Sequence, residues 1–190
     1  HNDDSEAFVN WFIEQAKKHN CETCIFLGDW HHHRSSVNVS TMNYTISNME
    51  RLNNAFKDVY VLMGNHDLFY REKREINSME FVRYLPNVHI VNDWMLLDDV
   101  ALIPWLEPDE YKKIPDITQR YIFGHFELPY FKMNAMVEMP DVGQIKAEHF
   151  VNQEYVFTGH FHKRQIRNNI HYMGNAFPHN YADAGDDERG

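Results

Sequence analysis

The sequence predicts an α/β fold with a largely parallel central sheet flanked by helices, and with antiparallel strands added in its second half. Three observations favour this class. Helical patterns alternate with short apolar runs in the first half of the chain. Four apolar runs end in a glycine followed by a polar residue, and functional side chains of parallel sheets gather beyond the carboxyl ends of the strands. The length of 190 residues predicts a single domain over residues 1–190.

The first half of the chain alternates between helix and strand. Asp3 and Asp4 place negative charge at a helix start, and apolar residues at helical spacing predict roughly four turns through Ala16. A short apolar run predicts a strand over residues 23–27, and a second helical pattern covers residues 42–56. The next strand is expected over residues 59–63, directly before the stretch Gly-Asn-His-Asp.

The second half contains shorter strand patterns and hairpins. A hairpin over residues 165–173 is expected to turn at Asn168 and Asn169. The charged run 71–75 mixes both signs, which predicts a solvated loop. The remaining strands, the second and third of them joined by a turn at residues 98–99, are predicted over residues 88–91, 95–97, 100–103, 121–123 and 155–158.

Composition limits the classes of function. The formal net charge of −10 argues against a broad basic surface that grips nucleic acid, so a phosphate-binding site must carry its positive charge locally. No stretch approaches the length of a membrane span and no signal segment opens the chain, so we expect a cytoplasmic protein without a membrane partner. Cys21 and Cys24 are expected to be buried structural thiols in a reducing compartment.

The four glycine endings predict a shared metal site. Glycine permits a tight turn and close backbone approach, so each strand can deliver its next side chain to one place. In the stretch His-Phe-His, side chains of an extended chain alternate, so both histidines would point the same way and Phe161 would pack on the other side. The metal-capable residues at these endings are Asp29, Asn65, His125, His160 and His162.

The donor set indicates which metals fit. Oxygen and imidazole nitrogen without thiolate suit Mn²⁺, Fe²⁺ or Zn²⁺ better than Ca²⁺ or Mg²⁺ alone, and do not decide among the first three. A single carboxylate among neutral ligands is explained if Asp29 bridges two ions. Two ions about 3.5 to 4 Å apart would activate a water and neutralise the oxygens of a phosphate under attack. They would also supply the positive charge that this acidic chain lacks.

The motifs GDWHHHR, VLMGNHD, FGHFE and TGHFH, in this order and spacing, resemble those of the calcineurin-like metallophosphoesterases. Within that superfamily the chain is similar to the SbcD-type DNA-repair nucleases, including the recombination endonuclease subunits of T-even phages. The lines PNVHIVND, ALIPWLE and MGNAF…DAGDDERG extend the likeness. Phosphatases of the superfamily carry GDxxDRG where this chain has GDWHHHR, which favours the nuclease branch. The resemblance implies a layered sandwich of mostly parallel sheets flanked by helices.

The resemblance also implies the metal ligands. Asp29 would bridge two divalent ions. One ion would be completed by Asn65, His125 and His160, and His162 would belong to the other.

Catalytic roles follow from the same resemblance. His66 matches the family's catalytic histidine, which stabilises the transition state or protonates the leaving oxygen. His32 falls where the repair nucleases often place a histidine partner of that residue. For His31 and His33, an exposed loop side chain or a hydrogen bond behind the ligands is favoured over a direct part in the chemistry. Asp67 is either an outer hydrogen-bond acceptor or a turn residue.

One motif of the family has no match. Its opening Asp-x-His, which follows the first strand and supplies ligands of the second ion, is not found before Cys21. We therefore expect the chain to begin after that strand, and to lack the C-terminal capping and ATPase-binding regions of SbcD-type proteins.

Three functions remain in competition. The first is a Mn²⁺-dependent DNA nuclease of recombination and repair, acting as a homodimer with an SbcC-like ATPase of the SMC type. The second keeps the metal chemistry but acts on a small phosphodiester or a phosphoprotein. The third is a protein-binding scaffold of the same fold.

Overall fold

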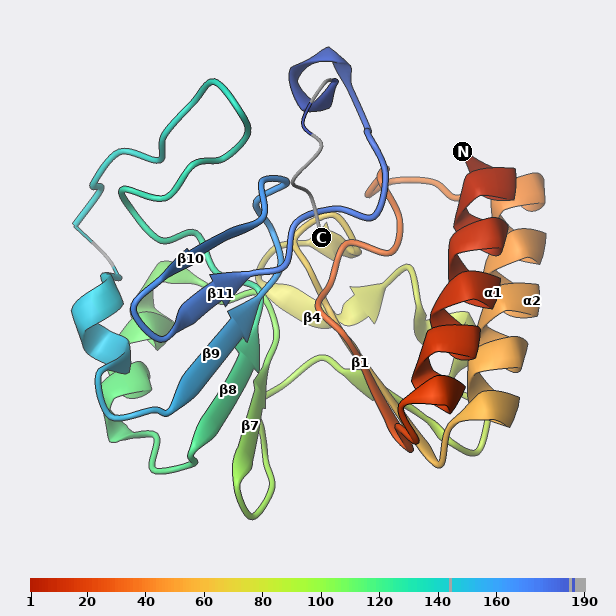
Figure 1. Cartoon of the computed structure of the whole chain (residues 1–190), viewed down its shortest axis with the longest axis horizontal. Coiled ribbons are helices and arrows are strands. Elements are labelled where there is room, and N and C mark those ends of the chain that lie inside the picture. The colour runs from red at the N-terminus through yellow and green to blue at the C-terminus, as the bar shows by residue number, and fades with distance from the viewer. Residues whose placement is uncertain (144, 185, 187–190) are drawn as a thin grey trace.

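The computed structural model describes residues 1–143, 145–184 and 186. Two sheets make up its centre. Helices cover the outer face of the smaller sheet, on the right of Figure 1, and short helices and loops cover the larger sheet on the left. The layered α/β class predicted from the sequence is confirmed.

The smaller sheet consists of three parallel strands, β1 (Thr23–Phe26), β2 (Asp58–Leu62) and β5 (Val88–Val91), in the order β1-β2-β5. Helices α1 (Asn2–Lys18) and α2 (Val39–Ala55) lie side by side against it (Figure 1). Their apolar faces and the sheet bury one core.

This part of the structure shows what starts α2 and whether the two cysteines are buried. Asn38 caps α2, because its side-chain oxygen accepts the backbone N–H of Thr41 at 2.8 Å. Cys24 is buried in the core beneath α1 and α2, whereas Cys21 is exposed. The prediction that both thiols are buried is therefore wrong for Cys21.

The larger sheet has six strands in the order β10-β11-β9-β8-β7-β6. Its four central strands run parallel, and β6 and β10 are antiparallel edges. The hairpins predicted around residues 98–99 and 168–169 are confirmed as β6-β7 and β10-β11. The strands are β6 (Met95–Leu96), β7 (Val100–Ile103), β8 (Tyr121–Gly124), β9 (Tyr155–Thr158), β10 (Gln165–Arg167) and β11 (Ile170–Tyr172).

The two sheets pack face to face through a small apolar cluster. Leu62 of β2 and Val91 of β5 meet Leu102 of β7, and all three side chains are buried. A separate core fills the outer face of the larger sheet. The sandwich thus has three apolar layers, and it brings strand ends of both sheets to one region.

The charged run 71–75 is only partly the solvated loop that the sequence predicts, because residues 71–72 form an exposed turn and residues 73–75 lie in a strand. Strands β3 (Leu68–Tyr70) and β4 (Lys73–Asn77) form a small antiparallel sheet there. The Arg74 guanidinium is mostly buried and pairs with Glu110 through two contacts, of 2.6 and 2.9 Å. The prediction therefore holds for the exposed turn and is wrong for Arg74, whose charge has a distant partner.

Four short 3₁₀ helices complete the described part of the chain, and the sequence patterns did not indicate them: Glu80–Val82, Pro108–Asp116, Ala147–Phe150 and Tyr181–Asp183. Within the described ranges, none of the helices combines the length and the apolar character that crossing a bilayer requires. Of the sequence line DAGDDERG, residues 185 and 187–190 lie outside the described part of the chain.

Candidate metal centre

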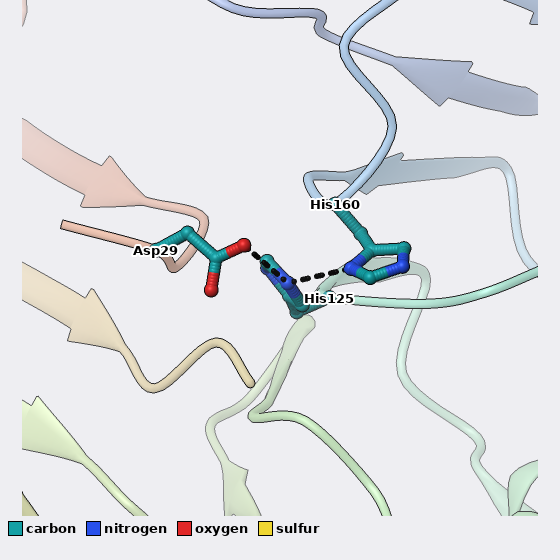
Figure 2. A group of neighbouring side chains, drawn as sticks. All are labelled: Asp29, His125 and His160. Atoms are coloured by element: carbon teal, nitrogen blue, oxygen red, sulfur yellow. Dashed lines mark hydrogen bonds and ion pairs between the residues drawn. The ribbon is translucent and has the colours of Figure 1, made fainter. Parts of the chain in front are cut away.

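The candidate centre lies beyond the carboxyl ends of four strands from both sheets. Asp29 follows β1 and Asn65 follows β2, while His125 and His160 follow β8 and β9. Figure 2 shows Asp29, His125 and His160 pointing toward one another. The sandwich therefore joins residues that lie far apart in the sequence.

Four polar atoms converge there. The Nε2 atom of His125 lies 3.3 Å from Asp29 Oδ2 and 3.1 Å from His160 Nδ1. The side-chain oxygen of Asn65 lies 3.2 Å from His125 Nε2 and 3.1 Å from His160 Nδ1. One ligand atom each from Asp29, His125 and His160 falls within 4.8 Å of the others.

The backbone determines which nitrogen His125 offers. Its Nδ1 lies 2.6 Å from the carbonyl oxygen of Leu27, which can only accept a hydrogen bond. Nδ1 therefore carries the proton in the neutral ring, and the lone pair of Nε2 faces Asp29 and Asn65. Electron-pair donors crowded together in this way fit a bound cation, and their O and N chemistry suits a divalent transition metal.

The negative charge of Asp29 also favours a cation at the centre. Burial alone would raise the pKa of Asp29, but the charge and hydrogen bond of His125 and the backbone N–H of His66 outweigh burial and lower it. Burial alone would lower the pKa of His125, but Asp29 outweighs burial and raises it. The carboxylate thus remains an anion, and the attraction between Asp29 and His125 shifts the pKa of each group toward its charged form.

Asp67 is a hydrogen-bond acceptor behind the centre. Its carboxylate is fully buried and accepts the backbone N–H groups of Asp29 at 2.7 Å, Gly64 at 2.9 Å and His31 at 3.1 Å. Burial and the nearby charge of Asp29 raise its pKa to about 7. Asp67 thereby ties the loop after β1 to the loop after β2.

The three consecutive histidines point in different directions. His31 is buried and hydrogen-bonds Ser78 at 2.7 Å and Thr45 at 2.8 Å, so it is a structural residue and not an exposed one. His32 and His33 are exposed, and their rings meet edge to face at 4.9 Å. The triple histidine is not a cluster of three ligands.

His66 stands beside His32. The two rings are parallel, with centroids 5.4 Å apart. The Nδ1 of His66 donates to the backbone oxygen of His32 at 2.8 Å, and the backbone N–H of His66 donates to Asp29 at 2.9 Å. Both predicted catalytic histidines therefore lie together at the edge of the centre.

His162 lies apart from the group formed by Asp29, His125 and His160. His160 has a φ of 85°, so the chain turns there and the two histidines do not repeat along an extended strand. His162 Nδ1 lies 3.1 Å from Asp183, and His162 is not in the group of ligand atoms within 4.8 Å. The expectation of an extended chain was wrong, although Phe161 does pack away, against Tyr172.

Three residues near the centre were missed by the sequence patterns. Glu127 pairs with His160, Asp183 pairs with His162, and the Trp105 ring lies 5.5 Å from that of His160. An acidic residue two positions after His125 was a local signal for Glu127. Trp105 and Asp183 lie in the stretches ALIPWLE and DAGDDERG that extend the family likeness, but nothing there indicated a place at the centre, because they reach it only through the tertiary fold.

Comparison with known proteins identifies a family, and the similar chains include a phage protein and a bacterial nuclease. The profile of the family "Calcineurin-like phosphoesterase" matches residues 1–164. A curated relative, "Exonuclease subunit 1" of Enterobacteria phage T4, is 26% identical over 171 residues, which cover 85% of this chain and 50% of the relative. The chain therefore spans about half the length of that relative.

A solved structure, the Pseudomonas putida nuclease MPE, is 19% identical, with a TM-score of 0.39 and coverage of 87% of this chain and 57% of that chain. The motif resemblance and the family profile agree, and the profile covers most of the sequence. The chain belongs to the calcineurin-like phosphoesterase family.

Proposed function

We propose that this protein is a DNA nuclease that hydrolyses phosphodiester bonds with divalent metal ions and acts in DNA recombination and repair. One observation carries the proposal: four metal-capable side chains converge beside a pair of histidines. The four are Asp29, Asn65, His125 and His160, and the pair is His32 and His66. The phage relative that shares 26% identity is named an exonuclease, which supports DNA as the substrate.

The family uses divalent metal ions, and the donor atoms of this centre fit them. We assign one ion to Asp29, Asn65, His125 and His160, and a second to Asp29 and His162, with Mn²⁺ ahead of Fe²⁺, Zn²⁺ or Mg²⁺. When bound, such ions supply Lewis-acid activation of water and neutralise charge on phosphate oxygens.

His66 is assigned to proton transfer at the leaving oxygen. Its Nδ1 is engaged by the carbonyl of His32, so Nε2 is the ring nitrogen left to hold or give a proton. His32 is exposed and stacked on His66, which supports a role over the bound phosphate. The side chains of His31, His33 and Asp67 are assigned no contact with substrate.

We further propose that residues 1–190 form one nuclease domain that works in the cytoplasm as a homodimer with an SbcC-like ATPase. The family resemblance implies these partners, and the phage relative is named a subunit, which supports an assembly of several chains. Light scattering of the purified chain tests the dimer, and co-purification with the ATPase tests the complex.

The experiment that tests the activity compares substrates and variants. With Mn²⁺, the chain is expected to cleave single- or double-stranded DNA faster than an aryl phosphodiester or a phosphopeptide. Asp29→Ala and His160→Ala should reduce cleavage to the level of the wild-type protein after a chelator has removed its metal. His19→Ala is the matched control, because His19 is exposed at the end of α1 and should leave activity unchanged.

The other outcomes contradict the proposal in different ways. Cleavage retained in both ligand variants would exclude this centre as the active site. Turnover of the aryl ester alone would identify a small phosphodiester as the substrate. Near-zero metal by elemental analysis, together with no hydrolysis, would favour the protein-binding scaffold.

A further inference from the structure

Glu127 contacts the His160 ring at the nitrogen that faces away from Asn65 and His125. The Nε2 of His160 lies 2.9 Å from Glu127 Oε1, and the His160 side chain is only 11% exposed. A neutral imidazole ring carries one proton, on either Nδ1 or Nε2. A carboxylate accepts hydrogen bonds, so Nε2 carries the proton and Nδ1 keeps its lone pair. Nδ1 is the atom that lies 3.1 Å from both Asn65 and His125.

His162 is held by Asp183 through the opposite ring nitrogen. Its Nδ1 lies 3.1 and 3.3 Å from the two carboxylate oxygens, so Nδ1 carries the proton and Nε2 keeps the lone pair. The Asp183 side chain is 3% exposed and also accepts hydrogen bonds from Asn175 at 2.9 Å and from the backbone of His179 at 3.0 Å. The carboxylate that orients His162 is thus itself fixed.

The turn between the two histidines means that the two rings are positioned separately. The left-handed conformation of His160, with φ of 85°, breaks the alternation of side chains. Phe161, between them, is buried and stacks on Tyr172 at 4.7 Å, so the turn cannot rotate freely to correct a misplaced ring. Each ring therefore depends on its own hydrogen-bond partner.

We propose that Glu127 and Asp183 are positioning residues for metal binding, which hold His160 and His162 in opposite tautomers so that the first offers Nδ1 and the second Nε2. The inference rests on the metal site of the proposed function, but it is independent of the substrate. Carboxylate partners of metal-binding histidines typically change metal affinity or activity by about 10–100-fold. The Gly-His-Phe-His turn thus depends on two carboxylates outside its own motif.

Nuclear magnetic resonance of the metal-free chain tests the tautomers directly. With ¹⁵N-labelled histidine at pH 8, long-range proton–nitrogen correlations should show the proton on Nε2 of His160 and on Nδ1 of His162. The variants His160→Gln and His162→Gln assign the two sets of signals. The same tautomer in both rings, or the reverse assignment, would overturn the inference.

Titration with Mn²⁺ alone, followed by calorimetry, tests the effect on binding. Glu127→Ala and Asp183→Ala should each weaken Mn²⁺ binding by about 10–100-fold. Glu127→Gln should weaken it less, because its amide oxygen can still accept the Nε2 proton. Glu154→Ala is the control, because Glu154 pairs with Arg120 before the start of β9, at the opposite end of the strand from His160.

The results separate this inference from the proposed function. Wild-type affinity in a folded Glu127→Ala variant, checked by circular dichroism, would overturn the positioning role while leaving the metal site intact. A wild-type chain that binds no Mn²⁺ would overturn the metal site and this inference together. If Asp183→Ala does not fold, Asp183→Asn and the tautomer of His162 in the wild-type chain decide its part.

Discussion

The imidazole rings of His32 and His66 lie parallel, with centroids 5.4 Å apart and planes 10° apart. They come from loops after two different strands, and the hydrogen bond from His66 Nδ1 to the His32 carbonyl fixes their relation. The His66 backbone in turn donates to Asp29, the carboxylate of the centre. The pair is therefore positioned by the loops that carry the proposed metal ligands, although neither ring is in the ligand group.

Removing the ring of His32 should separate turnover from metal binding. His32→Ala keeps the carbonyl that holds His66 but removes the stacked ring, so we expect DNA cleavage to fall while Mn²⁺ affinity stays within about 2-fold. His66→Ala should reduce turnover by roughly 10²–10⁴-fold, as expected for loss of a general acid. Steady-state cleavage rates and Mn²⁺ titration measure the two effects.

His33→Ala is the matched control for His32→Ala. His33 is the exposed neighbour of His32 and meets its ring edge to face at 4.9 Å. Its loss should leave turnover within about 2-fold. If His32→Ala loses its metal instead of its turnover, the role assigned to His32 is wrong.

Asp67 is expected to stabilise the fold through backbone N–H groups. In Asp67→Asn, the new NH₂ group must face at least one of the three N–H donors that the carboxylate now accepts. An unsatisfied buried donor costs about 1–3 kcal/mol, so the free energy of unfolding should fall by about that much. Denaturant unfolding in the presence of a chelator measures it, because bound metal would otherwise contribute.

Asp58→Asn serves as the comparison for Asp67. Asp58 pairs with His89 at 2.9 Å, but the Asp58 side chain is 46% exposed. Such exposed pairs contribute about 0–1 kcal/mol. Equal losses in both variants would show that the buried backbone donors of Asp67 are not responsible.

Much of the centre could be predicted because parallel strands end at a common edge. A glycine and a polar residue after each apolar run were enough to indicate that Asp29, Asn65, His125 and His160 meet, and the structure brings them together. The sandwich of two sheets, not one sheet, creates that meeting point. No local pattern reveals how two sheets face each other.

The errors have equally specific causes. Alternation of side chains assumes an extended chain, and the left-handed φ of His160 breaks it. The charged residues of β4 were interpreted as a loop. The segment is a strand, and the Arg74 charge is buried against Glu110, 36 positions along the chain. Pairing over such distances leaves no periodic signal in the sequence.

Gly64 is expected to be irreplaceable at the centre. A Cβ at this position would collide with the Asp29 carboxylate and backbone nitrogen, and would lie 2.7 Å from His125 Cε1. Gly64→Ala should therefore displace two of the proposed ligands and abolish Mn²⁺ binding in calorimetry. Gly143→Ala is the control, because no atom lies within 4 Å of its added Cβ; its φ of 80° makes alanine strained there, so stability should fall while Mn²⁺ affinity stays normal. Normal Mn²⁺ affinity in Gly64→Ala would contradict the tight packing described for the loops after β1 and β2.

The two cysteines should differ sharply in reactivity. Burial raises the pKa of Cys24 to about 12, so at pH 8 only about one in ten thousand of these thiols is ionised, whereas Cys21 is exposed. A thiol reagent should thus modify one cysteine rapidly in the native chain and two in guanidinium, and Cys21→Ser should remove the rapid phase. Two rapid phases in the native chain would contradict the burial of β1.

Mn²⁺ should slow the modification of Cys24 further. Cys24 lies on β1, and β1 leads directly into Asp29, so exposing the thiol requires an opening that also withdraws a proposed ligand. A ligand that binds only the closed form stabilises that form, and the free energy gained grows with the logarithm of the ratio of ligand concentration to Kd. The rate for Cys24 should therefore fall as Mn²⁺ rises, whereas the rate for exposed Cys21 should not change. In Asp29→Ala the effect of Mn²⁺ on Cys24 should disappear, because the segment that follows β1 no longer supplies a metal ligand.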